Sequence, residues 1–299
     1  MFCQYSNLKM IWIHIRSMKE IKVYLAHYRT IRFFERQVKL IRKYFRYNKD
    51  TTSLKLYGFV DSPNDSSSEE MRRKWIELDV IPIDLPRGRS SDFSESYGLA
   101  FQFIYDYYIK YDKYISIFLE NDMFPIDYID IEMYSKDYSV CGEIRFNTAD
   151  LPDRMLMFYL GLQIFNHENM PNKDIYSGIS GTITASSGNT HWIDCGGFTY
   201  YWLNYNDNYK SIKHIPTNGY IQKPYDPFTS PTCEVHNIEN DVENLPEYLR
   251  EGYHPMFRVV IYDNIFLHLE RMGNDYDKDP IKAAKNVWFD DIFARLMNR

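Results

Sequence analysis

The sequence is poor in cysteine and contains no long hydrophobic run. Its 299 residues include four cysteines, and they are scattered without a Cys-x-x-Cys pair. This argues against a disulfide scaffold and against a cysteine zinc cluster, and it makes reducing conditions the default expectation. No apolar run reaches the length of a transmembrane helix, and the stretch MIWIHI at 10–15 is too short for a signal-peptide core. We therefore expect a cytoplasmic protein without a membrane span of its own.

The sequence also lacks an excess of positive charge, with 35 Lys and Arg against 41 Asp and Glu. The formal net charge is −6, which argues against a nucleic-acid binder whose affinity comes from neutralising phosphates. The basic residues gather at 29–46 with helical spacing, which is typical of a solvated helix face. The motifs GxSxG, GxxxxGK[ST], HExxH and GxGxxG are absent. Their absence excludes the commonest serine hydrolases, P-loop NTPases, zinc proteases and dinucleotide-binding proteins.

The first part of the chain does contain a regular alternation of apolar segments and amphipathic ones. Predicted strands lie at 21–28, 53–65, 79–86 and 114–122, and predicted helices at 30–48, 66–78 and 90–111. This order is typical of an α/β protein with a mainly parallel sheet and helices on both faces.

The pattern is looser after residue 128. Segments 139–146 and 157–166 are predicted as strands or as a strand and a short helix, and 167–205 as loops and short strands ending in a helix. Two short strands with a turn at Asp263-Asn264 are expected within 256–270, and a closing amphipathic helix at 279–298. We predict one domain with two halves, 20–128 and 129–299, after an N-terminal extension of residues 1–19.

The most informative stretch is YISIFLENDMFPID at 114–127, a buried strand that ends in Glu120, Asn121 and Asp122. In parallel sheets, ligands lie beyond the carboxyl ends of the strands. Carboxylate oxygens there suit Mg²⁺ or Mn²⁺, which can be shared with a substrate diphosphate. The alternative is that these acids only end the strand. Other polar residues at the same predicted edge are His27, Tyr28 and Asp61.

The segment FLENDMFP at 118–125 resembles the Asp-x-Asp strand end of GT-A type nucleotide-diphospho-sugar transferases, with Glu120 replacing the first Asp. The segment KVYLAHYRTIRFFERQVKLI at 22–41 resembles the first nucleotide-binding strand and helix of that family. The resemblance covers roughly residues 20–128. It implies a GT-A fold, a nucleotide-diphosphate sugar donor and a hydroxyl acceptor such as a glycan. It also implies Mn²⁺ or Mg²⁺ on Asp122, and leaves the role of Glu120 open.

The resemblance also implies roles for residues at the nucleotide-binding edge. Asp61 would hold the base and ribose, with the alternative that it caps a turn. Tyr28 would stack on or border the base, with the alternative that it is a core residue. His27 and Asn121 are predicted as further nucleotide-sugar contacts.

The segment HWIDCGGFTYYWL at 191–203 resembles the acceptor side of the same family. Gly196 and Gly197 permit a tight backbone close to a sugar, and the amides of the following helix can meet a phosphate, so both are predicted nucleotide-sugar contacts. Asp194 is predicted to be the catalytic base that deprotonates the acceptor hydroxyl, and the alternative is that it caps the following helix. Weaker candidates for the base are Glu143 and Asp174. Possible sugar-stacking rings are Trp192, Tyr200, Tyr201 and Trp202.

A histidine near the C-terminus completes the metal shell in many GT-A enzymes. The segment IFLHLERM at 265–272 resembles that region, which makes His268 the predicted metal ligand. His254 is the competing choice, and a packed core position is the ordinary alternative for a lone histidine in an apolar run. The sequence thus predicts a metal-dependent glycosyltransferase, with a non-catalytic carbohydrate-binding protein or a metal-dependent phosphohydrolase as alternatives.

Overall fold

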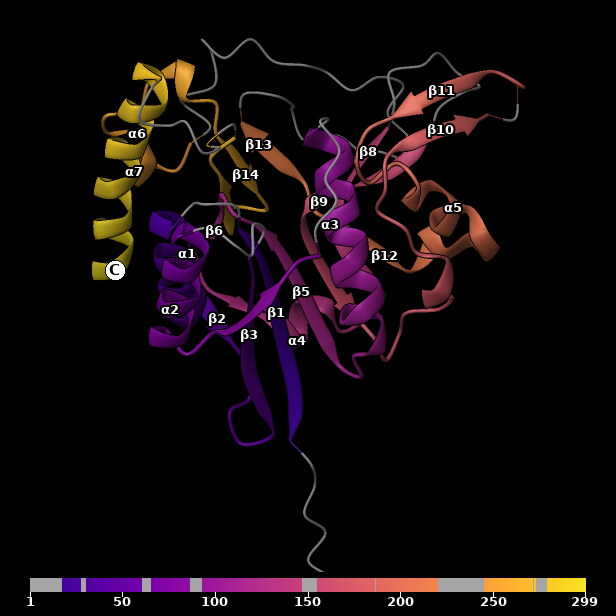
Figure 1. Cartoon of the computed structure of the whole chain (residues 1–299), viewed down its shortest axis with the longest axis horizontal. Helices are drawn as coiled ribbons and strands as arrows, with labels where there is room; N and C mark the ends of the chain where they lie inside the picture. Colours follow the sequence, from indigo (N-terminus) through magenta and orange to yellow (C-terminus); the bar gives the residue numbers. More distant parts are fainter. Residues whose placement is uncertain are drawn as a thin grey trace, which may run out of the picture.

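A large mixed sheet forms the centre of the protein. The structure is a computed structural model, which describes residues 18–27, 31–60, 66–86, 93–146, 155–185, 187–219, 245–270, 272 and 279–299. In this described part, the central sheet has seven strands in the order β12-β8-β9-β5-β1-β3-β4 (Figure 1). Their bounds are β1 Lys19–His27, β3 Thr52–Val60, β4 Ile81–Asp84, β5 Ile115–Glu120, β8 Val140–Phe146, β9 Leu156–Asn166 and β12 Ile212–His214.

Most neighbours in this sheet are parallel. Strand β1 lies between β3 and β5 and is parallel to both, and β4 and β12 are parallel to their neighbours β3 and β8. Strand β9 is antiparallel to β5 and β8. The predicted α/β architecture with a mainly parallel sheet is confirmed, and strands from both predicted halves of the chain share this sheet.

Helices cover both faces because alternate residues of each strand point to opposite sides. On β1, Ile21 and Val23 belong to the core formed with α1 (Ile31–Tyr44) and α2 (Ser66–Glu77). Tyr24 belongs instead to the core formed with α3 (Phe93–Tyr107). The sheet is therefore buried on two sides, as the apolar composition of its strands predicts.

A smaller antiparallel sheet joins the carboxyl end of β5. Among the described residues it contains β13 (Thr217–Gly219), β14 (Val260–Tyr262), β15 (Phe266–His268) and β6 (Met123–Pro125), in that order. The hairpin of β14 and β15 turns at Asp263 and Asn264, which both have positive φ, so the predicted turn is confirmed. Strand β6 follows β5 after only two residues, and this connects the two sheets directly.

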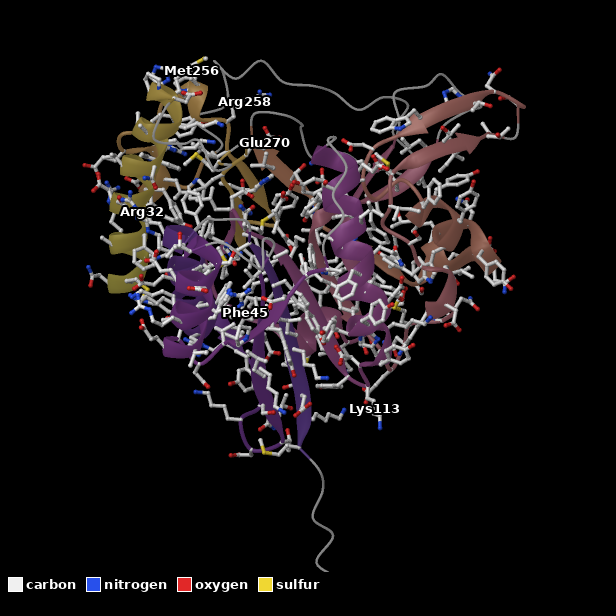
Figure 2. All side chains as sticks on the ribbon, viewed as in Figure 1. Arg32, Phe45, Lys113, Met256, Arg258 and Glu270 are labelled. Atoms are coloured by element: carbon white, nitrogen blue, oxygen red, sulfur yellow. The ribbon has the colours of Figure 1, made fainter. Side chains whose placement is uncertain are left out.

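The C-terminal helix α7 (Pro280–Asn298) packs against α1. Asp279 caps it by accepting hydrogen bonds from the amides of Ile281 and Lys282. Arg36 on α1 is 8% exposed and pairs with Asp290, which Arg32 also contacts; Figure 2 shows Arg32 on this side of the molecule. The basic face predicted for 29–46 is therefore not simply solvated, because part of it holds the C-terminal helix.

The remaining elements are short. They are β2 (Phe45–Arg46), β7 (Ile129–Asp130), α4 (Ile131–Ser135), β10 (Gly181–Thr184), β11 (Thr190–Ile193), α5 (Thr199–Asn204) and α6 (Glu247–Arg250). No helix within the described ranges is long and apolar enough to cross a membrane.

Candidate metal centre

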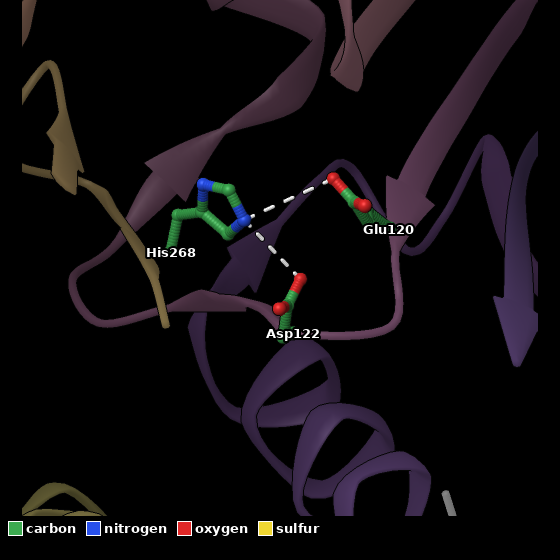
Figure 3. A group of neighbouring side chains, drawn as sticks. All are labelled: Glu120, Asp122 and His268. Atoms are coloured by element: carbon green, nitrogen blue, oxygen red, sulfur yellow. Dashed lines mark ion pairs between the residues drawn. The ribbon is translucent and has the colours of Figure 1, made fainter. Parts of the chain in front are cut away.

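Three potential metal ligands meet at the junction of the two sheets (Figure 3). Glu120 is the last residue of β5, Asp122 lies in the turn before β6, and His268 is the last residue of β15. The antiparallel register pairs His268 with Met123, and the amide of Leu269 donates to the carbonyl of Asp122 at 3.0 Å. Backbone pairing therefore brings the C-terminal histidine to the acidic turn.

The side chains of this triad lie within coordination range of one another. His268 Nε2 is 3.3 Å from Asp122 Oδ1 and 3.9 Å from Glu120 Oε2. One ligand atom from each residue can be chosen so that all three lie within 4.8 Å. Two carboxylates and one imidazole form a ligand set that can hold a divalent cation.

The triad is buried and incompletely satisfied. Asp122 is 5% exposed and His268 3% exposed. Among the described residues, His268 Nδ1 has no hydrogen-bond partner, and Asp122 Oδ1 makes no hydrogen bond but faces His268 Nε2 at 3.3 Å. A buried carboxylate oxygen without a hydrogen bond is costly, and a bound cation would lower this cost. The residues present therefore fit a divalent cation.

The pKa values of Glu120 and His268 are raised by their surroundings. Burial and the neighbouring carboxylate of Asp122 raise the pKa of Glu120 to about 7. Burial by itself lowers the pKa of His268, but the charges of Asp122 and Glu120 outweigh it, so this pKa is raised overall. Glu120 and His268 therefore hold protons more readily, in the same space that a cation would occupy.

Gln37 on α1 holds the acidic turn from behind. Its Nε2 donates to the backbone carbonyls of Glu120 at 2.7 Å and Met123 at 2.6 Å. His27 lies 2.9 Å from Gln37 Oε1 and is only 1% exposed, packed against the ring of Trp75. The structure therefore places His27, a predicted nucleotide-sugar contact, in the core behind the turn. The sequence reasoning missed Gln37, because nothing in the helical pattern marks it.

Lys285 on α7 holds the chain that follows His268. This lysine is 3% exposed, and its Nζ donates to the carbonyls of Leu269 at 3.2 Å and Glu270 at 2.5 Å. Burial lowers the pKa of Lys285 to about 8. Sequence reasoning missed this residue too, because a lysine on an amphipathic helix is ordinarily assigned to the solvent face.

The diglycine segment packs against β9. Gly196 has a φ of +88°, and a Cβ there would lie 2.1 Å from the carbonyl oxygen of Phe158, so glycine is required.

Burial raises the pKa of Tyr97 well above its usual value, with further contributions from Glu120 and Cys195. Tyr97 on α3 therefore lies near both the triad and the segment that contains Gly196 and Gly197.

Asp194 is exposed and accepts a hydrogen bond from the amide of Cys195 at 2.7 Å. The N-cap of α5 is Phe198, so the alternative that Asp194 caps this helix is wrong.

Trp202 is fully buried and donates to the carbonyl of Pro171, so the expectation that its ring stacks on a sugar is wrong. Trp192 and Tyr201 are 59% and 48% exposed, and Tyr200 is half-buried.

The competing candidates have other partners. His254 accepts from the amide of Met256 and caps a short 3₁₀ turn. Asp174 is exposed and pairs with Lys110 at 2.7 Å. Glu143 is 1% exposed and pairs with Arg145 at 2.8 Å. Asn121 lies in the acidic turn, whereas Tyr28 and Asp61 lie outside the described residues.

Two cavities lie at the opposite edge of the sheet. One of about 540 Å³ is lined by the start of β3 and by Arg42, Arg46 and Lys49, and one of about 470 Å³ is lined by the start of β1 and by Asp112. Neither is lined by a triad residue. The second cavity is also lined by the acids Glu20 and Glu168, but among the described residues only the triad brings three potential metal ligands within 4.8 Å of one another, which points to the carboxyl edge.

Comparisons with known proteins found only partial likeness to solved structures. The chain matches no protein-family model and no curated protein. It is similar in structure to the galactosyltransferase LgtC in complex with donor and acceptor sugar analogues, at 9% identity and a TM-score of 0.38, over 65% of this chain and 73% of that chain.

Two further solved structures are similar. The bifunctional glycosyltransferase WbbM in its apo form has 11% identity and a TM-score of 0.40, over 66% of this chain and 39% of that chain. The apo-form glycosyltransferase GlyE of Streptococcus pneumoniae TIGR4 has 17% identity and a TM-score of 0.30, over 50% and 35%. The matched part thus spans less than half of the WbbM and GlyE chains. At these TM-scores the likenesses assign no function to this chain.

Proposed function

We propose that this chain is a metal-dependent glycosyltransferase that moves a sugar from a nucleotide-diphosphate donor to a hydroxyl acceptor. The observation that carries the proposal is the convergence of Asp122, Glu120 and His268 at the carboxyl end of β5. This edge is where open α/β sheets bind their ligands. The resemblance of FLENDMFP to the Asp-x-Asp strand end gives the same assignment from the sequence.

In this proposal, Asp122 and His268 hold Mn²⁺ or Mg²⁺, and Glu120 completes the set. The bound cation would neutralise the charge that develops on the leaving diphosphate. Gln37 and Lys285 fix the two backbone segments that carry these ligands, so the geometry is set before the donor binds.

The remaining roles follow the sequence resemblance. Asp61 and Tyr28 are proposed to hold the nucleoside of the donor, together with Asn121. Asp194 is proposed to accept the proton of the acceptor hydroxyl as that oxygen attacks the anomeric carbon. Its exposed carboxylate and the exposed ring of Trp192 support an acceptor side that is open to an incoming glycan.

A thermal-shift screen of nucleotide sugars with and without Mn²⁺ tests this function. A ligand that binds only the native state raises the melting temperature, with about 2.7 kcal/mol of stabilisation at a hundredfold excess over Kd. We expect at least one donor to stabilise the protein only when Mn²⁺ is present. This stabilisation should disappear in Asp122→Asn. The thermal unfolding of that variant without ligand should remain cooperative.

The matched control is Asp207→Asn, which removes an exposed carboxylate that pairs with Lys210 and keeps a residue that tolerates positive φ. This variant should respond to the donor as the wild type does. A donor effect that persists in Asp122→Asn would contradict the metal assignment. Mn²⁺-dependent cleavage of a generic phosphoester, with no response to any nucleotide sugar, would favour a phosphohydrolase.

A further inference from the structure

The acid that replaces the first Asp of the motif has its own side-chain partner. Tyr159 on β9 donates its hydroxyl hydrogen to Oε2 of Glu120 at 2.8 Å. This Oε2 atom also lies 3.9 Å from Nε2 of His268. One carboxylate oxygen of Glu120 is therefore fixed between a tyrosine and the histidine of the triad.

An irregularity in the β8–β9 ladder places Tyr159 there. Gly142 pairs with Gln163 and Ile144 pairs with Phe158, so the single residue Glu143 faces the four residues 159–162 of β9. Bulges bend a strand and re-aim its side chains, and they are common beside active sites. In this case the extra residues carry the tyrosine to the carboxyl end of β5.

Gly161 shows how close this approach is. A Cβ at Gly161 would lie 2.8 Å from Oε2 of Glu120 and 2.4 Å from Cε1 of Tyr159. Any side chain at this position would collide with both partners. The backbone of β9 thus leaves space for the hydrogen bond between Tyr159 and Glu120 and for nothing larger.

The ring of Tyr159 is itself held by neighbouring side chains. The guanidinium of Arg145 lies 3.9 Å from the centre of this ring, and Glu143 holds Arg145 at 2.8 Å. Tyr262 stacks parallel to Tyr159 at 6.4 Å and donates to Oε2 of Glu143 at 3.2 Å. Cation–π contact and stacking restrict the ring, so its hydroxyl has a defined position.

We infer that Tyr159, held by Arg145 and Glu143, is a positioning residue that fixes Glu120 as the third ligand of the proposed metal. This inference rests on the proposed function, since it assigns a partner to one ligand of that same site. A glutamate side chain has one more rotatable bond than an aspartate. The hydrogen bond from Tyr159 removes this freedom and lets the longer acid serve where the motif has Asp. Such partners of metal ligands typically change metal affinity by about 10–100-fold.

The test is a titration of the full chain with Mn²⁺ alone, in which the paramagnetic resonance signal of free Mn²⁺ reports binding. Tyr159→Phe keeps the ring and removes only the hydroxyl. It should weaken Mn²⁺ binding by at least about tenfold. Tyr105→Phe is the matched control, because it removes a buried hydroxyl that donates to the carbonyl of Lys173 in the other core. It should bind Mn²⁺ as the wild type does.

A double-mutant cycle separates positioning from a general loss of structure. If Tyr159 acts through Glu120, Tyr159→Phe should change the affinity of Glu120→Ala, which has no side-chain oxygen to accept the hydrogen bond, by less than about twofold. Equal weakening in both backgrounds would overturn the inference, and so would wild-type affinity in Tyr159→Phe. A wild type that binds no Mn²⁺ would instead overturn the metal-dependent function, and with it the role assigned to Tyr159.

Discussion

His27 and Gln37 form a buried pair in which the imidazole Nε2 is the donor and the amide Oε1 the acceptor, 2.9 Å apart. The direction of this bond follows from the two hydrogen bonds that Gln37 Nε2 already donates, to the carbonyls of Glu120 and Met123. The pair fixes the acidic turn without contacting the space between the ligands. A residue at the end of the first strand thus supports the site through the backbone.

We predict that Gln37→Leu destabilises the protein and weakens Mn²⁺ binding. Leucine has a similar size, but it leaves the carbonyls of Glu120 and Met123 and the donor of His27 without their partner. Buried groups that lose a partner cost about 1–3 kcal/mol each, so a loss of about 3 kcal/mol is expected. Urea unfolding measures the loss. An unchanged free energy of unfolding would show that water or another side chain replaces the amide.

The stability of the native state should fall as the pH is lowered from about 6.5 towards 4. Burial lowers the pKa of His27 to about 4 and, together with nearby lysines, that of His167 to about 3. Between these values and the ordinary pKa near 6.5, the unfolded state binds protons that the native state does not. Each histidine then contributes up to about 1.4 kcal/mol of lost stability per pH unit.

His27→Gln isolates one of these contributions, because the glutamine amide can still donate to Gln37. Urea unfolding at several pH values should give a slope that is smaller by about 1 kcal/mol per pH unit in this variant. The comparison with the wild type cancels the carboxylates that titrate in the same range. Identical slopes would mean that His27 is protonated in the native state.

The sequence predicted the elements of the site better than the contacts within it. The alternation of strands and helices places Asp122 at the carboxyl edge, and its residue type suggests a cation there. His268 follows only from the resemblance of IFLHLERM to the C-terminal region of GT-A enzymes. The pairing of β6 with β15, which joins them, depends on tertiary packing.

Other features had no local signal. The helix predicted at 30–48 ends at Tyr44, because Phe45 and Arg46 pair with β7 instead. Tyr159 acquires its partner from a bulge, and a two-residue period cannot indicate where a ladder slips. Trp202 was expected at the acceptor side, but the periodicity of a short helix does not reveal which face is buried.

Lys285→Met should loosen the segment after His268. The methionine fills the same volume, but it cannot donate to the carbonyls of Leu269 and Glu270. We expect a loss of about 2 kcal/mol in the free energy of unfolding, together with weaker Mn²⁺ binding. Lys282→Met, on the same helix and half-buried, is the control and should stay within about 0.5 kcal/mol of the wild type. Equal effects of the two substitutions would assign the loss to charge rather than to the backbone contacts.

Gly161→Ala should weaken Mn²⁺ binding while much of the sheet remains folded. The added methyl group would lie 2.8 Å from Oε2 of Glu120 and 2.4 Å from the ring of Tyr159, so one of these side chains must move. We expect at least about a tenfold loss of Mn²⁺ affinity, because the moved group no longer fixes the third proposed ligand.

Gly188→Ala is the contrasting variant. Its site is open but has a φ of +90°, so this variant should lose stability and keep its Mn²⁺ affinity. Circular dichroism and the Mn²⁺ titration together separate these outcomes. If Gly161→Ala kept full Mn²⁺ affinity, Glu120 would not need the position that β9 gives it, and Asp122 and His268 would carry the cation without it.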